Sequence, residues 1–210
     1  MSDSYKKRLG ELSVERVRAL SDGIFAFAMT VLVLDLHLPD AIYRTNAEFL
    51  SILAAHWHHL LSFLLSFVVL AMYWIAHHNT FILVNRTTRI LVVANLVFLM
   101  CIVLIPFAAS FLGQDSLIQA AVVTYGIVLS LTSSALALLV TYVFRNEGLV
   151  EQENVPAGLF KAALQRILFP IFVYFLSVVT SFESIQASVA IYVILPIVFL
   201  LPSRVDHWSK

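Results

Sequence analysis

Cysteine, glycine and charge are all scarce in this chain of 210 residues. The single cysteine, Cys101, excludes a disulfide within the chain and therefore a fold held together by such bonds. Charged residues make up 12% of the sequence and hydrophobic residues 60%, whereas a soluble domain is about 25% charged and about half apolar. Because so few polar groups cannot cover a surface in water, the outer solvent of this chain must be the lipid bilayer.

Other signals are missing as well. The thirteen basic and thirteen acidic residues cancel, so net charge indicates no nucleic-acid partner. The sequence contains no recognisable pair of nucleophile and base and no H-E-x-x-H motif, so we expect no enzyme and no catalytic residue. It also lacks T-V-G-Y-G, the motif of a selectivity filter built from backbone carbonyls.

Six apolar segments account for most of the chain, and most approach the ~20 residues that a bilayer-spanning helix needs. They cover residues 14–38, 49–76, 90–112, 116–144, 159–180 and 185–201. Short polar connections separate them, and no soluble insertion interrupts them. We therefore predict an all-α polytopic membrane protein with six transmembrane helices, folded as a single domain over residues 1–210.

The basic residues predict the orientation of these spans. With six spans, twelve of them fall on one side of the membrane and only Arg44 on the other. The twelve are Lys6, Lys7, Arg8, Arg16, Arg18, Arg86, Arg89, Arg145, Lys161, Arg166, Arg204 and Lys210. Since short cytoplasmic loops carry the excess of Lys and Arg, both termini are predicted to be cytoplasmic. Five or seven spans would break this partition.

The first apolar segment is unusual because acidic residues bound a short apolar core. Between Asp22 and Asp35 lie twelve uncharged residues, about 18 Å of helix against the ~30 Å of a hydrocarbon core. A carboxylate at that depth needs a partner or a watery surface, so we expect this helix to be central in the bundle. Arg18, four residues before Asp22, is a candidate partner on the same helix face, while Arg16 must reach another helix. A structural ion pair is favoured over direct contact with ions.

One stripe of this helix suggests a second role. At about 100° per residue, Phe27, Val31 and Leu34 lie within a narrow arc, with Thr30 at its edge. An apolar stripe on a membrane helix more often serves packing than a pore. A threonine alone more often bonds the carbonyl of the residue four positions earlier, here Ala26. Spacing leaves both interpretations open.

The sequence RVRALSDGIFAFAMTVLVLD at residues 16–35 resembles the first helix of the transmembrane protein 175 family of potassium channels. The family motif is R-x-x-x-F-S-D. Arg16, Ser21 and Asp22 match it, while Leu20 replaces the usual phenylalanine. Residues 74–81, WIAHHNTF, also resemble the tryptophan-and-histidine segment of the family's second helix.

The resemblance implies a leak-type, potassium-permeable channel in the cell membrane of a prokaryote. Such members form homotetramers of six-helix subunits, need no cofactor, and line a central pore for monovalent cations with their first helices. Constriction by side chains replaces a carbonyl filter, and the corresponding positions here are Phe27, Val31 and Leu34. Thr30 corresponds to the hydroxyl linked to potassium preference. Phe27 stands where a smaller aliphatic residue is usual.

The remaining positions have supporting roles under this resemblance. A network behind the pore is expected to join the first helix to the second, through Arg16, Ser21, Asp22, Trp74 and His77. Asp35 has two interpretations that we weigh evenly: an acidic ring at the pore mouth that concentrates cations, and a solvated helix end.

Two other classes of function were considered. His56, His58 and His59 cluster in sequence, and His56 and His59 share a helix face as a metal pair would. However, no cysteine or carboxylate cluster accompanies them, so we predict no metal site. The main alternative to a channel is a secondary transporter or proton-conducting pathway that uses Asp22 and nearby histidines. Against a transporter, the chain has no inverted repeat and no pair of broken helices.

Overall fold

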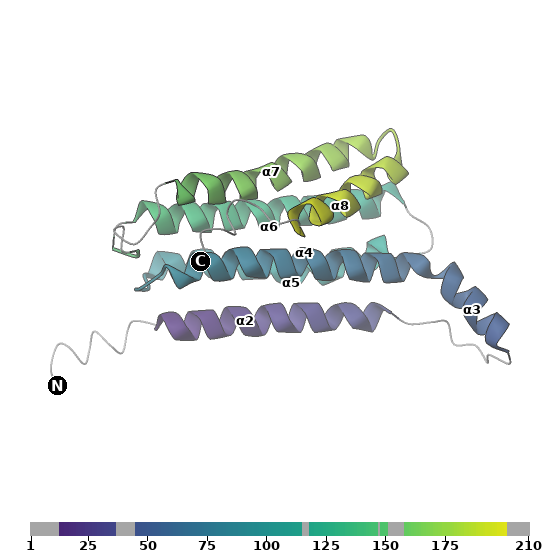
Figure 1. Ribbon diagram of the computed structural model, residues 1–210, viewed down its shortest axis with the longest axis horizontal. Coiled ribbons are helices and arrows are strands. Elements are labelled where there is room, and N and C mark those ends of the chain that lie inside the picture. The colour runs from purple at the N-terminus through teal and green to yellow at the C-terminus, as the bar shows by residue number, and fades with distance from the viewer. Residues whose placement is uncertain (1–12, 37–44, 115–117, 147, 151–157, 201–210) are drawn as a thin grey trace.

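The computed structural model describes residues 13–36, 45–114, 118–146, 148–150 and 158–200, and these parts contain helices and connecting turns but no strand. The elements are α2 (Val14–Val31), the 3-10 helix η1 (Leu32–Asp35), α3 (Asn46–Ala55), α4 (Trp57–Ile82), α5 (Arg89–Leu112), α6 (Gln119–Arg145), α7 (Leu159–Thr180) and α8 (Ile185–Leu200). Figure 1 shows that the long helices run nearly parallel to one another. The predicted all-α polytopic class is confirmed.

Five of the six predicted spans are matched by a helix that meets the length of a membrane span. Within the described residues, five helices are long and apolar enough to cross a membrane: Val14–Asp35, Trp57–Ile82, Arg89–Leu112, Gln119–Arg145 and Leu159–Thr180. The sixth apolar segment forms α8, which has 16 residues, or about 24 Å at 1.5 Å per residue. It therefore counts as a shorter apolar helix beside the five candidate spans.

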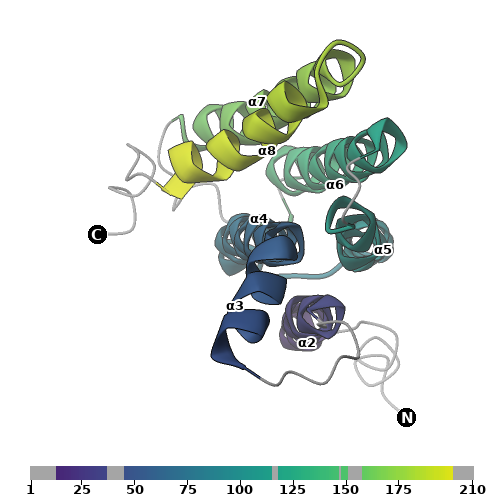
Figure 2. The ribbon, with the colours of Figure 1, turned by 90° about the vertical axis from the view of Figure 1, so that its right-hand side faces the viewer.

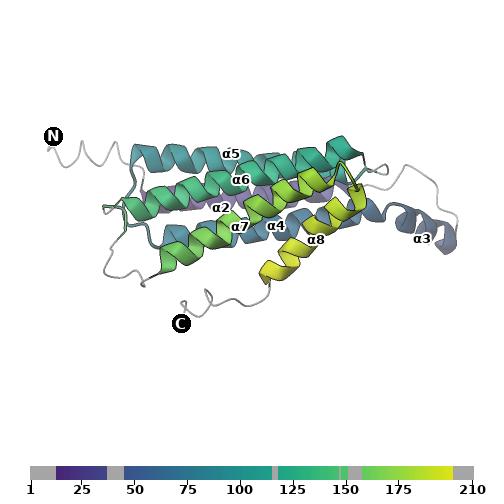
Figure 3. The same ribbon diagram turned by 90° about the horizontal axis from the view of Figure 1, so that it is seen from above.

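The second apolar segment differs from its predicted bounds of 49–76. It is divided at His56, whose φ of −99° and ψ of 24° are not helical, into the short α3 and the 26-residue α4. A ring nitrogen of His56 lies 2.8 Å from the carbonyl oxygen of Ile52. At the break, this side chain therefore competes with backbone N–H groups for the same carbonyl acceptor. Figure 3 shows α3 extending beyond the ends of the other helices. At its other end α4 continues past the predicted bound, so that His77 and His78 lie inside it.

The first long helix, α2, lies at the edge of the helix bundle. Seen end-on in Figure 2, α4 and α5 lie between α2 and the group formed by α6, α7 and α8. Among the described elements, α2 packs only on α4, α5 and η1. The sequence predicted a helix central in the bundle, whereas within one chain α2 has a face without a helical neighbour.

Buried hydroxyl groups hold the opposite half of the bundle together. The Tyr192 hydroxyl of α8 donates to the Val122 carbonyl of α6 at 3.0 Å, and a Cβ added to Gly126 would lie 2.1 Å from that hydroxyl oxygen. Glycine is therefore required for the close approach of α8 to α6. The Ser177 and Ser188 hydroxyls lie 2.8 Å apart and join α7 to α8. Small and hydroxyl-bearing residues of this kind are typical of contacts between membrane helices.

The basic residues gather at one end of the bundle. The seven lysines and arginines among the described residues lie at or near the end where α2, α5 and α7 begin and where α4 and α6 finish. They are Arg16, Arg18, Arg86, Arg89, Arg145, Lys161 and Arg166. The other six, including Arg44, lie outside the described residues. The described part therefore agrees with the partition that the sequence predicted.

Candidate functional site

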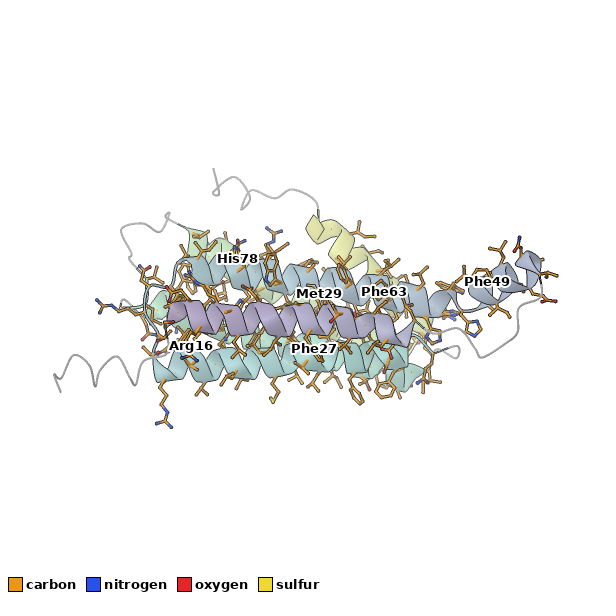
Figure 4. The ribbon with its side chains drawn as sticks, turned by 90° about the horizontal axis from the view of Figure 1, so that it is seen from below. Arg16, Phe27, Met29, Phe49, Phe63 and His78 are labelled. Atoms are coloured by element: carbon orange, nitrogen blue, oxygen red, sulfur yellow. The ribbon has the colours of Figure 1, made fainter. Side chains whose placement is uncertain are left out.

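The two faces of α2 differ in what covers them. Its buried residues, Val14, Val17, Ser21, Phe25 and Ala28, followed by Leu32 of η1, recur every three or four positions and face α4 and α5. Of the predicted constriction residues, Phe27 and Leu34 are 65% and 72% exposed, whereas Val31 is half-buried. Figure 4 looks onto this helix and shows Phe27 on the side next to α5, with Met29 on the side next to α4. The helix therefore presents large apolar side chains on a face that the other described helices leave uncovered.

Thr30 lies on the same exposed face. Its hydroxyl donates to the carbonyl oxygen of Phe27 at 2.8 Å, one residue nearer than the Ala26 carbonyl expected from sequence. With its proton engaged in this bond, the hydroxyl oxygen keeps lone pairs to offer to a cation or to water. The exposed stripe thus carries an acceptor oxygen between two bulky apolar side chains.

Two hydrogen-bonded contacts join α2 to the helices behind it. The indole nitrogen Nε1 of Trp74 donates to Oδ1 of Asp22 at 2.8 Å. On the buried face, the Asn95 amide donates to Oγ of Ser21 at 3.0 Å, and its Oδ1 lies 2.8 Å from Nε2 of His77. Because an amide oxygen only accepts, Nε2 of His77 carries the proton in this arrangement. Four of the five residues expected in this network therefore lie in it, together with Asn95.

Asn95 of α5 was not predicted, although the sequence held a signal for it. It is the one asparagine in the otherwise apolar segment 90–112, and a polar side chain inside a span usually faces the bundle and finds a partner. It is 1% exposed and lies between Ser21 of α2 and His77 of α4. One amide therefore bonds to both neighbouring helices.

The two arginines of α2 behave differently from the prediction. Arg16 is exposed, and the structure gives its side chain no hydrogen-bond partner within the described residues. Arg18 was the candidate partner of Asp22, but its guanidinium donates to the carbonyl oxygens of Phe81 and, at 3.1 Å, Val84. These carbonyls end α4, where a positive charge complements the helix dipole. Arg18 therefore ties the start of α2 to the end of α4.

A groove of about 250 Å³ runs between α2 and α5 beside the exposed stripe. From α2 it is lined by Phe27, Ala28 and Val31, and Asp35 closes one end. Its α5 wall comes from residues three or four positions apart: Val103, Pro106, Phe107 and Ser110. Sequence analysis did not find this wall, because the contact depends on how two helices pack.

Asp35 also lines a much smaller space, of about 10 Å³, together with His59 and Ser62. The rings of His56 and His59 are stacked with their centroids 6.0 Å apart. Over the described ranges, no three histidine, cysteine, aspartate or glutamate side chains come together in a group that could hold a metal ion. The geometry brings Asp35 and His59 to one place, at the end of α2 opposite the arginines.

Comparison with known proteins identifies the family. Residues 16–106 match the family described as "Endosomal/lysosomal potassium channel TMEM175". A potassium channel of Chryseobacterium sp. (strain P1-3) is 29% identical over 90% of this chain and 93% of its own length. The crystal structure of a lysosomal potassium-selective channel TMEM175 homologue from Chamaesiphon minutus superposes with a TM-score of 0.76, at 28% identity over 90% of this chain and 96% of that one. The chain is thus similar to a TMEM175 channel over 90% of its length. The resemblance predicted from residues 16–35 is confirmed, and with it an ion-channel family and not an enzyme.

Other TMEM175 relatives match a smaller share of their length. A potassium channel of Streptomyces collinus is 34% identical over 54% of this chain and 56% of its own. The human protein, described as an endosomal/lysosomal proton channel, is 34% identical over 40% of this chain but 18% of its own length. The family descriptions therefore name two different cations, and the similarity to the human protein is restricted to a part of it.

Proposed function

We propose that this protein is a leak-type, potassium-permeable cation channel in which α2 from each of four identical subunits lines a central pore. The observation that carries the proposal is the face of α2 that packs on no other described helix of its own subunit and bears Phe27, Thr30 and Leu34. One helix cannot enclose a pore, so copies of this face must surround an axis. The potassium-channel relatives support the choice of cation.

The proposed constriction is a set of apolar rings formed by Phe27, Val31 and Leu34. A cation passes such a ring poorly, because hydrocarbon replaces none of its hydration shell, and a narrow apolar ring also excludes water. The exposed Phe27 and Leu34 would form the narrowest rings, and the half-buried Val31 a wider one. Thr30 would supply an oxygen between them that favours potassium, and Asp35 would add negative charge at the mouth.

The remaining parts of the proposal concern assembly and placement. Residues 1–210 would form one channel domain with α8 as its sixth, shorter span, in the cell membrane of a prokaryote with both termini cytoplasmic. The grouping of the described basic residues at one end supports this orientation. The contacts of Ser21, Asp22, Trp74 and His77 support a structural role behind the pore, and Arg16 at the cytoplasmic end would contact a neighbouring subunit.

The test is reconstitution into liposomes with opposed potassium and sodium gradients and measurement of the reversal potential. Phe27→Asn should wet the constriction and raise the current. Phe172→Asn on α7 is the matched control, because Phe172 is also 65% exposed and α7 does not contact α2. Cross-linking in detergent should give a tetramer. A strictly monomeric protein that conducts, or equal effects of the two variants, would contradict the proposal.

The proposed role of Thr30 in ion selectivity is tested with a matched pair of threonine variants. Thr30→Ala should lower the preference for potassium over sodium while flux continues. Thr124→Ala on α6 is the control, since Thr124 is partly exposed and also bonds a carbonyl of its own helix, that of Ala120, at 2.7 Å. If both variants keep the wild-type reversal potential, Thr30 does not select the ion.

The alternative is a transporter or proton pathway, and the proton-channel relatives keep the second of these open. The same liposomes, given a pH gradient without a potassium gradient, distinguish them. A reversal potential that follows the pH gradient alone would favour protons. Flux that saturates and depends on a second solute would favour a transporter, whereas single-channel current steps would exclude it.

A further inference from the structure

The groove between α2 and α5 lies beside the proposed constriction and has the shape of a site for an aromatic ring. Its volume of about 250 Å³ exceeds the ~150 Å³ of an apolar cavity that binds benzene. Its middle is lined by apolar groups, including Val103, Pro106 and Phe107, while the polar Asp35 and Ser110 complete the lining. A phenyl ring would therefore fit both in size and in chemistry.

The wall of the groove is already in place. The ring of Phe107 packs edge-on against Phe111 of the same helix, with the centroids 4.7 Å apart. Pro106 has a rigid ring that offers no polar group to a side chain in the groove. The site therefore needs no rearrangement of α5 before it receives a ring.

Phe27 can reach this site by a side-chain rotation. It borders the groove, yet 65% of it is exposed on the face that we assign to the pore. On a helix, phenylalanine uses two χ1 wells, near 180° and −60°, and a change between them moves the ring around the helix while the backbone stays in place.

We propose that the α2–α5 groove receives the Phe27 ring when the pore conducts, and that Val103 and Phe107 are positioning residues for this gate. This inference rests on the proposed channel function. With the ring outward, four phenyl groups narrow the pore. With the ring in the groove, the pore is lined at that level by the helix backbone and small side chains. Phe27 is larger than the aliphatic residue that the family usually has at this position, and the groove accommodates its ring when the pore conducts.

The test varies the size of residue 103, where a side chain 48% exposed leaves room for a larger one. Val103→Leu and Val103→Phe should fill the groove in steps and lower the potassium current, the second by about fivefold or more, a factor that corresponds to about 1 kcal/mol. Val103→Ala should raise it. The same substitutions at Val97 of α5, which is 46% exposed and does not line the groove, are the matched control.

The deciding measurement repeats Val103→Phe in a Phe27→Ala background. Because that background has no ring to accommodate, filling the groove should leave its raised current unchanged, and this non-additivity is the signature of coupling between the two residues. An equal loss of current in both backgrounds, or equal effects at positions 97 and 103, would overturn the inference while the channel function stands. A protein that conducts neither with Phe27 nor with alanine there would overturn both.

Discussion

Asn95→Leu is the substitution whose cost the structure defines best. The amide is buried between α2 and α4, where it donates to Ser21 and lies 2.8 Å from Nε2 of His77. Leucine is close to asparagine in size and suits an apolar helix, so the change removes hydrogen bonds with little loss of volume. The imidazole of His77, which is 2% exposed, then keeps an N–H group without a partner.

The magnitude follows from what each partner loses. Ser21 still donates to the Val17 carbonyl at 2.9 Å, so its loss is small. His77 is enclosed by the rings of Phe25, Phe81 and Phe98, with centroids 5.9, 4.3 and 5.6 Å away, and water does not replace the lost amide. A buried donor left unsatisfied costs about 1–3 kcal/mol. A single hydrogen bond between membrane helices averages only about 0.6 kcal/mol, so most of the loss comes from desolvation.

The assay is reversible unfolding of the protein in mixed detergent and SDS, followed by circular dichroism. We expect Asn95→Leu to lower the free energy of unfolding by about 2 kcal/mol. His77→Phe combined with Asn95→Leu should recover most of it, because replacing both partners by apolar groups of similar shape is nearly neutral. If the single variant is as stable as the wild type, or the double variant is less stable than the single one, the network does not hold α2 in the way we infer.

Two further predictions concern how the helices are joined. Arg18→Met should loosen the end of α4, because it removes a guanidinium that caps that helix. Amide hydrogen exchange at the end of α4 should therefore become faster. Arg86→Met, at an exposed arginine of the following loop, should have no such effect. Gly126→Ala should destabilise the protein by about 1–3 kcal/mol through overpacking, since its Cβ would lie 2.1 Å from the Tyr192 hydroxyl oxygen. Gly23→Ala, whose Cβ would meet nothing within 4 Å, should be neutral or stabilising in the same unfolding experiment, and equal costs at the two glycines would contradict the proposed contact.

Sequence reasoning succeeded where the physics is local or set by the bilayer. Hydropathy located the apolar helices, because a span must be apolar along its length whatever it packs against. The predicted network that joins Ser21 and Asp22 to Trp74 and His77 came instead from resemblance to a family. Asn95, which connects Ser21 to His77, required the structure, since spacing along α5 does not show which helices lie beside it.

The failures at Arg18 and at His56 both involve contacts that hydropathy and spacing do not show. Arg18 was assigned to Asp22 from their spacing of four residues, yet its guanidinium instead donates to backbone carbonyl groups at and just after the end of α4. Those carbonyls belong to residues more than sixty positions away in sequence. The break at His56 likewise depends on a side-chain contact with Ile52 that a hydropathy profile does not register. A tertiary partner therefore replaced the local one at Arg18, whereas the contact at His56 is itself local, between residues four positions apart.

The two faces of α2 have different roles: the inner face contributes to the stability of the fold, and the outer face is the one that we assign to conduction. Ser21 faces the interior of the subunit and is fixed by Asn95, whereas Phe27 and Thr30 face outward and contact little of their own chain. A substitution on the inner face should therefore change unfolding before it changes current, and one on the outer face should do the reverse. Asp22 lies at the border, since it is exposed and yet bonds Trp74. Because an asparagine oxygen can accept that same bond, Asp22→Asn removes the charge and keeps the hydrogen bond, so the current of this variant measures the contribution of the charge alone.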